Sequence, residues 1–118
     1  MATLGGIIDI PAVVDGVEAN LSSHARFYYR LERKAGRPWL ISGFDGVYLR
    51  DELLPAIPGT TLHVPLEELE GLRKPYRLLA WLQIKLGYRP NMELAGEDRP
   101  DLTAALEAEL FGWAGITP

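Results

Sequence analysis

The stretch VEANLSSHARFYYRLER, residues 17–33, decides the fold. Apolar or small side chains stand at its odd-numbered positions, from Val17 to Leu31, and mostly polar ones at the even-numbered positions, from Glu18 to Glu32. Successive side chains of a β-strand point to opposite faces of a sheet, so this alternation is typical of a strand with one dry and one polar face. We therefore predict a strand over the whole stretch.

Two more strands are predicted beside it. Residues 7–14 are apolar and β-branched, and the Asp15-Gly16 dipeptide after them is a strong hairpin signal. Pro11 cannot donate a hydrogen bond to a neighbouring strand, so this first strand is expected at a sheet edge or bent there. A turn around Gly36 then leads into a third strand at residues 38–50, which is rich in aromatic and β-branched side chains.

The second half of the chain predicts helices. Pro65, followed by two glutamates, suits the first turn of a short helix. Residues 76–86 are apolar on nearly every side, which predicts a helix that is buried on more than one side. A final helix carries leucines and Trp113 on one stripe, and Asp98 or Asp101 is expected to cap its start.

Together these elements predict a single α+β domain over residues 1–118, with an antiparallel strand meander at about 6–51 and a helical part at about 65–114. Twelve basic against sixteen acidic residues give a net charge of −4, which argues against a nucleic-acid partner. The chain has no cysteine, which excludes disulfides and thiolate zinc sites, and its two histidines form no metal motif.

The remaining sequence signals are negative ones. No glycine-rich nucleotide-binding fingerprint occurs, so we expect no cofactor. The first residues lack the basic and apolar regions of a signal peptide. No apolar run approaches the roughly 20 residues of a membrane span. We therefore expect a cytoplasmic protein that has no membrane partner.

A polar patch is predicted on the even-numbered face of the central strand. If Ala35-Gly36 forms a two-residue turn, the register places Arg26 directly opposite Asp45, and opposite charges attract across an antiparallel pair. The same register puts the rest of the patch on this face: His24, Tyr28 and, further along, Trp39.

Two interpretations of this patch stay open. In one, the patch lines a pocket, where His24 and Asp45 are the catalytic acid and base and where Arg26, Tyr28 and Trp39 bind the substrate. In the other, the patch is a solvated sheet face with an ordinary cross-strand ion pair, because any half-exposed strand shows such alternation.

One stretch, ARFYYRLERKAGRPWLISGFDGVYLRDELLPAIPG at residues 25–59, resembles the last two sheet strands of nuclear-transport-factor-2-like, or SnoaL-like, proteins. Pro38 departs from the pattern because it stands between the arginine and the tryptophan of the turn. Downstream, the stretch from Arg73 to Ala114 is similar to the helical tail of an uncharacterised bacterial branch. The residues that match the strand pattern are Arg26, Tyr29, Arg30, Gly36, Arg37, Trp39, Ile41, Phe44, Asp45, Tyr48, Arg50 and Asp51.

The resemblance implies a cystatin-like cone, a curved sheet of three to four strands packed with helices. It also implies a pocket for a small hydrophobic ligand, and an isomerase, cyclase, dehydratase or hydrolase that works by general acid/base catalysis. Such domains usually begin with helices over the sheet, whereas this sequence begins almost at the strands. Three alternatives follow: the fold is truncated, the C-terminal helices take the place of the missing ones, or a second chain covers the open face. The alternative function is therefore a non-catalytic binding or oligomerisation domain, with a homodimer or another subunit covering the open sheet face.

Overall fold

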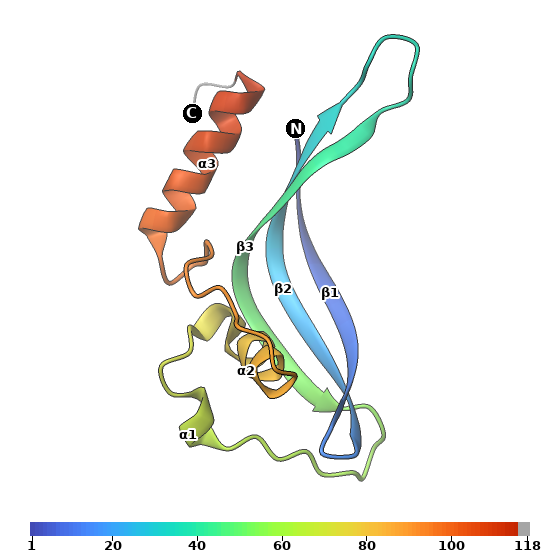
Figure 1. The fold of residues 1–118 in the computed structure, drawn as a ribbon, viewed down its shortest axis with the longest axis vertical. Helices are drawn as coiled ribbons and strands as arrows, with labels where there is room; N and C mark the ends of the chain where they lie inside the picture. Colours follow the sequence, from blue (N-terminus) through green and yellow to red (C-terminus); the bar gives the residue numbers. More distant parts are fainter. Residues whose placement is uncertain (116–118) are drawn as a thin grey trace.

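The computed structural model describes residues 1–115 and has an α+β fold around a three-stranded antiparallel sheet (Figure 1). The strands are β1 (Ala2–Val14), β2 (Val17–Glu32) and β3 (Leu40–Pro55), in the order β1-β2-β3. The predicted meander is thus confirmed, and it extends a few residues beyond each predicted end. Strand β1 lies at an edge, as Pro11 requires.

Four helical elements follow the sheet. They are α1 (Leu66–Leu69), the 3₁₀ helix η1 (Lys74–Tyr76), α2 (Arg77–Lys85) and α3 (Pro100–Ala114). The predicted cap of the last helix is wrong: α3 starts with a proline and has no side-chain cap, because Asp98 binds Arg73 and Asp101 binds Arg99. Helix α2 is also less buried than predicted, since Ile84 is 50% exposed.

The two long helical elements lie on opposite faces of the sheet. Helix α2 packs on Leu21 of β2, with Trp81 and Leu82 in one core cluster. Helix α3 packs on Tyr28 of β2, with Leu110 in a second core cluster. Strands β1 and β2 pair without irregularity, so odd-numbered and even-numbered residues of β2 point to opposite faces. We call these the odd face, which carries α2, and the even face, which carries α3.

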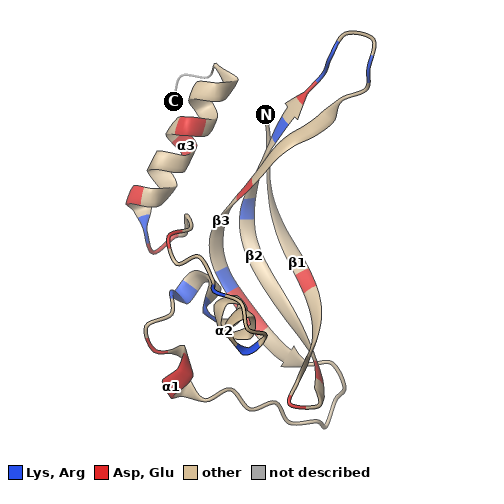
Figure 2. Ribbon diagram, in the orientation of Figure 1, with Lys and Arg blue, Asp and Glu red and all other residues tan. Residues whose placement is uncertain are grey.

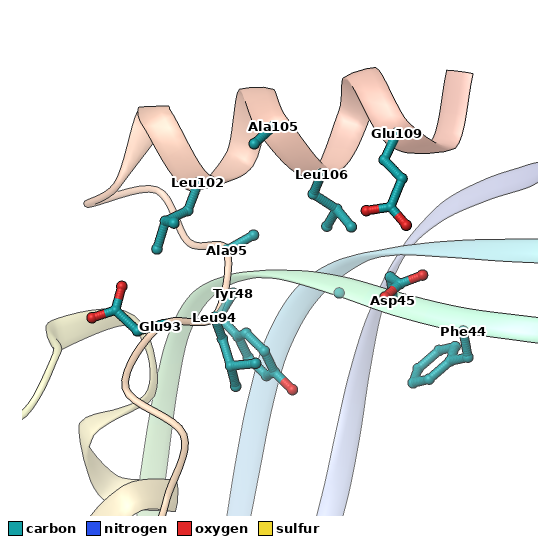
Figure 3. Close-up of a pocket in the computed structure, with 11 residues that line it drawn as sticks. Phe44, Asp45, Tyr48, Glu93, Leu94, Ala95, Leu102, Ala105, Leu106 and Glu109 are labelled. Carbon is teal, nitrogen blue, oxygen red and sulfur yellow. The ribbon is translucent and has the colours of Figure 1, made fainter. Parts of the chain in front are cut away.

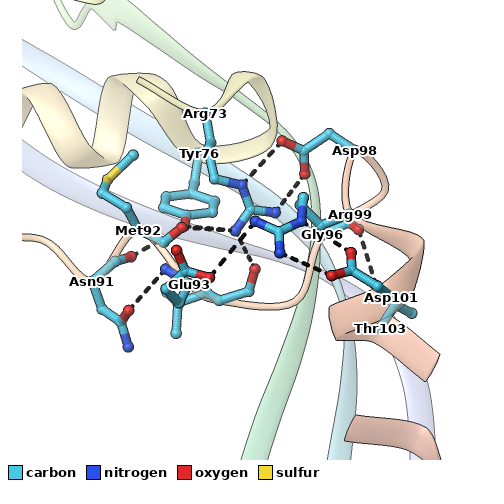
Figure 4. Close-up of polar contacts among 11 residues, drawn as sticks. Arg73, Tyr76, Asn91, Met92, Glu93, Gly96, Asp98, Arg99, Asp101 and Thr103 are labelled. Carbon is cyan, nitrogen blue, oxygen red and sulfur yellow. Dashed lines mark hydrogen bonds and ion pairs between the residues drawn. The ribbon is translucent and has the colours of Figure 1, made fainter. Parts of the chain in front are cut away.

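The chain passes from one face to the other around the outer edge of β3. There Tyr48 donates its N–H to the carbonyl of Ala95 at 3.1 Å, and Glu97 donates its N–H to the carbonyl of Tyr48 at 3.0 Å. Arg73 fixes this crossing segment (Figure 4): its guanidinium donates to both oxygens of Asp98, to the Tyr76 hydroxyl and to two backbone carbonyls, those of Met92 and Leu94. Arg73 therefore holds the crossing segment in place by hydrogen bonds.

A buried carboxylate positions α2 on the odd face. Asp51 of β3 accepts the backbone N–H of Leu79 at 2.8 Å, so it satisfies one of the free donors in the first turn of the helix. Burial raises the pKa of Asp51, and the helix N–H groups oppose this shift only in part. Asp51, which matches the family pattern, thus has a structural partner here.

The molecule is elongated rather than compact. Its radius of gyration is 17.1 Å, against about 13.5 Å for a compact domain of this length. Much of the extension comes from the β2–β3 hairpin, which continues beyond the last β1 pair, Ala2 with Tyr29 (Figure 1). We call residues 31–41 the arm.

Candidate functional site

The predicted register between β2 and β3 is wrong by two residues. Arg26 lies opposite Val47, and Asp45 lies opposite Tyr28, so the predicted Arg26–Asp45 pair does not form. The tight turn after Lys34 is present, but Pro38 cannot donate to the ladder and β3 starts only at Leu40. One register shift lies beyond Arg30, and a second lies between His24 and Ala25. A net shift of two residues near Asp45 keeps this residue on its predicted face.

Arg26 and Tyr28 find their partner on α3 instead of β3. Arg26 donates to Glu107 at 2.8 Å and to the Tyr28 hydroxyl at 2.9 Å, and that hydroxyl donates to Glu107 at 3.0 Å. The hydrogen bond to Tyr28, followed by the contact with Glu107, raises the pKa of Arg26. These two proposed substrate-binding groups are therefore already bound to one another and to a carboxylate of the same chain.

Asp45 lies in a second polar group one step further along the strands. Arg30 of β2 stands 4.0 Å from Asp45 and 3.3 Å from Glu109 of α3. The Arg30 guanidinium also stacks over the ring of Trp113, with 5.6 Å to the ring centre. The even face thus holds α3 through two arginines, Arg26 and Arg30, that bind acids of the helix.

The other two predicted site residues lie apart from Asp45. His24 is opposite Ile7 on one side and Arg50 on the other, near the middle of the strand. Trp39 lies in the arm and is 63% exposed. The sequence therefore placed five residues in one patch. The structure joins Arg26 to Tyr28 by a hydrogen bond and places Asp45 directly opposite Tyr28 on β3, but it leaves His24 and Trp39 apart.

Asp45 lines the groove between α3 and the outer edge of β3 (Figure 3). The groove has a volume of about 380 Å³, which lies within the range of about 300–1,000 Å³ that is usual for small-ligand sites. Glu109 of α3 points towards β3 over the groove, and Glu93 stands at its other end. The remaining lining is mostly apolar and includes Phe44, Tyr48, Leu94, Leu102 and Leu106.

Glu107 and Glu109 were missed by the sequence analysis. They flank Leu106 and Leu110 of the apolar stripe on α3, one residue away from it. A helix that packs by that stripe carries these two acids to the edges of its contact with the sheet. The sequence did contain a signal for the pairing of α3 with β2: two arginines on the polar face of β2 and two acids beside the leucine stripe of α3.

An apolar surface remains on the odd face beyond α2. We call it the apolar sheet face; it consists of Leu4, Ile8, Phe27, Tyr29, Ile41 and Phe44, which the strand register places on one side. Four of these are at least 40% exposed: Leu4, Ile8, Ile41 and Phe44. The part of the even face that α3 leaves open is mixed: Asp9, Asn20 and Ser22 are joined by hydrogen bonds there. The same part of the face also carries three exposed apolar side chains, those of Ile7, Val13 and Leu54.

Three aromatic rings pack against one another on the apolar sheet face. The rings of Phe27 and Phe44 stack with 5.0 Å between their centres, and Tyr29 lies 5.1 Å from Phe44. The ring of Phe27 lies over two glycines: a Cβ on Gly6 would stand 3.1 Å from it, and one on Gly46 would stand 3.5 Å from it. Aromatic side chains contribute much of the energy of protein interfaces.

The described part of the chain has neither a metal cluster nor a membrane-spanning helix. Among residues 1–115, no group of three histidine, cysteine, aspartate or glutamate side chains is placed to hold a metal ion. Within the same residues, no helix has both the length and the apolar character to cross a membrane.

Comparison with known proteins does not assign the chain to a family. No family model matches the chain. No curated protein matches it either. The resemblance to SnoaL-like proteins therefore stays a prediction.

Proposed function

We propose that this chain is a non-catalytic assembly domain, in which the apolar sheet face binds a second copy. The observation that carries the proposal is the contrast between the two uncovered parts of the sheet. The open part of the odd face is a continuous apolar surface with stacked aromatic rings, whereas on the open part of the even face the exposed apolar side chains are interrupted by a hydrogen-bonded polar cluster. Large continuous apolar patches on a monomer mark interaction sites.

The accessible surface of the monomer supports the same proposal. It is 7772 Å² for a chain of 13.1 kDa, whereas a compact monomer of this mass exposes about 6,400 Å². The excess of roughly 1,400 Å² exceeds the roughly 800 Å² that each partner of a standard interface buries. Two-fold pairing is the commonest closed way to cover such a surface.

Replacement of Leu4 by arginine is expected to separate the two copies. Leu4 is 52% exposed on the apolar sheet face, and a charge there would be buried without a partner in the dimer. Light scattering should give the mass of a dimer for the wild type at micromolar concentration and the mass of a monomer for Leu4→Arg.

Ile7→Arg is the matched control for this experiment. Ile7 belongs to the same strand and is 57% exposed, but it points to the even face. The Ile7→Arg variant should therefore remain a dimer. A monomeric wild type, or equal dissociation of the two variants, would contradict the proposed function.

A pocket enzyme of the SnoaL-like kind, with a cone-shaped sheet, is the second candidate. The observation in its favour is that Asp45 lines a groove of about 380 Å³ with Phe44 and Tyr48. Asp45 would act there as general base, whereas His24, the acid that the sequence predicts as its partner, does not line the groove. Against it stands the pairing of Arg26 and Tyr28 with Glu107, which leaves neither group free for a substrate.

The Asp45→Asn variant tests this second candidate. The exchange is nearly isosteric, so the fold should remain. On the pocket hypothesis, hydrophobic carbonyl and epoxide compounds raise the melting temperature of the wild type, and Asp45→Asn loses this shift. Glu97→Gln, an acid outside the groove, is the control. Equal shifts for the wild type and Asp45→Asn, or no shift for either, reject the catalytic role.

A further inference from the structure

We infer that the arm of each copy lies across the apolar sheet face of the other copy and that its basic tip enters the groove between α3 and β3 there. This inference rests on the proposed function, because it names the segment of the second copy that covers the apolar sheet face.

The arm has the composition of a docking segment. It carries three basic residues, Arg33, Lys34 and Arg37, and one acid, whereas the rest of the chain has nine basic and fifteen acidic residues (Figure 2). Trp39, Leu40 and Ile41 follow the tip, and each is 63% exposed. Exposed tryptophan and arginine side chains are typical anchors of protein interfaces.

The tip of the arm is held in one conformation without a partner. Arg37 donates its backbone N–H to the carbonyl of Lys34 at 3.0 Å. The Arg33 guanidinium donates to the carbonyl of Arg37 at 3.0 Å. Gly36 has a φ of +75°, which the turn requires and which other residues rarely adopt. A segment ordered before binding loses less conformational entropy when it binds.

The groove complements the arm in charge and polarity. Its lining is mainly apolar, and three carboxylates surround it: Asp45, Glu93 and Glu109. The side chain of Glu93 is 71% exposed and that of Glu109 is 69% exposed, so both can accept further donors. Basic residues beside a tryptophan match an apolar groove with an acidic rim.

The arm of the same copy cannot reach this groove. Asp45, which lines the groove, and Leu40, where the arm joins, belong to the same continuous strand β3, and the arm points away from the body of the molecule (Figure 1).

A second copy related by a two-fold axis near Ile41 runs antiparallel to the first. Arg37 of one copy then lies level with Asp45 of the other, because each is four residues from Ile41. The arm thus covers the Phe44 region of the partner on its way to the groove.

Charge reversal tests the contact between the arm and the groove. Arg37→Glu should raise the dissociation constant of the dimer about tenfold, since like charges would meet at the groove. Glu109→Lys, beside Asp45, should have the same effect, and an equal mixture of the two variants should restore part of the wild-type affinity. Arg89→Glu and Glu97→Lys, which change exposed charges outside the arm and the groove, are the controls.

Disulfide trapping gives a second and independent readout, because the chain has no cysteine of its own. An Arg37→Cys copy mixed with a Glu109→Cys copy of different mass should form a mixed disulfide under mild oxidation, because Glu109 stands over Asp45. Arg37→Cys mixed with Lys74→Cys should not. A dimer by light scattering that shows neither the mixed disulfide nor charge rescue overturns the arm contact and leaves the proposed function standing. A monomeric wild type overturns both.

Discussion

Replacement of Arg73 by methionine is expected to destabilise the fold by about 3 kcal/mol. Its side chain is only 12% exposed and donates to Asp98, to Tyr76 and to the carbonyls of Met92 and Leu94. Without the guanidinium, two carbonyls lose their partner and a partly buried carboxylate loses its counter-charge. The free energy of unfolding in urea measures the effect. Arg73→Lys should recover only part of it, since an ammonium cannot make the forked contact with Asp98.

The contribution of the Arg73–Asp98 ion pair to stability depends on pH. Arg73 holds the pKa of Asp98 below its ordinary value of 3.8. The pair therefore contributes stability above pH 3.8, and this contribution is lost as the pH falls through the lower pKa of the folded state. The difference in stability between the wild type and Arg73→Met should shrink over that range. Arg99→Met, which breaks the exposed pair with Asp101, should change stability little, and an equal loss there would contradict the assignment.

Replacement of Phe27 by alanine is expected to cost about 3–5 kcal/mol of stability. Phe27 is 3% exposed although no helix covers it, because its ring lies on Gly6 and Gly46 and stacks on Phe44. Alanine would leave bare backbone on three adjacent strands. Thermal or urea unfolding of the purified variant measures the loss.

Phe44→Ala is the matched control for this loss. It removes the same side chain from the same stack, but Phe44 is 50% exposed and its truncation opens no cavity. We expect this variant to keep most of the stability and to weaken the dimer instead. The role assigned to Phe27 is wrong if both variants lose stability equally.

The strands could be predicted from the sequence because their signal is local. The alternation of residues 17–33 fixed both the length of β2 and its dry face, and Asp15-Gly16 marked its hairpin. The partners of Arg26 and Asp45 could not be predicted in the same way. At the start of the ladder Glu32 lies opposite Leu40, one residue from the predicted pairing, and the register shift between Arg30 and Leu31 adds the second residue.

The position of the helices depends on contacts that are distant in the sequence. The leucine stripe of α3 predicted which side of the helix is buried, but it could not predict which face of the sheet receives it. That choice follows from the crossing around β3, where Arg73 and the bridge of Tyr48 to Gly96 hold the chain. The predicted cap at Asp98 was wrong for the same reason. The Asp98 carboxylate binds Arg73, which is 25 positions away in the sequence, and therefore does not cap the helix.

The two cores on opposite faces of the sheet divide the folding of this small chain into two parts. One core joins α2 to Leu21, the other joins α3 to Tyr28, and they lie on opposite faces of the three strands that connect them. Helix α3 can therefore detach as a unit while α2 stays seated, which gives amide protons in α3 faster exchange with solvent than those in α2. Trp113 of α3 and Trp81 of α2 would then report different unfolding midpoints, and the chain would have two stabilities rather than one.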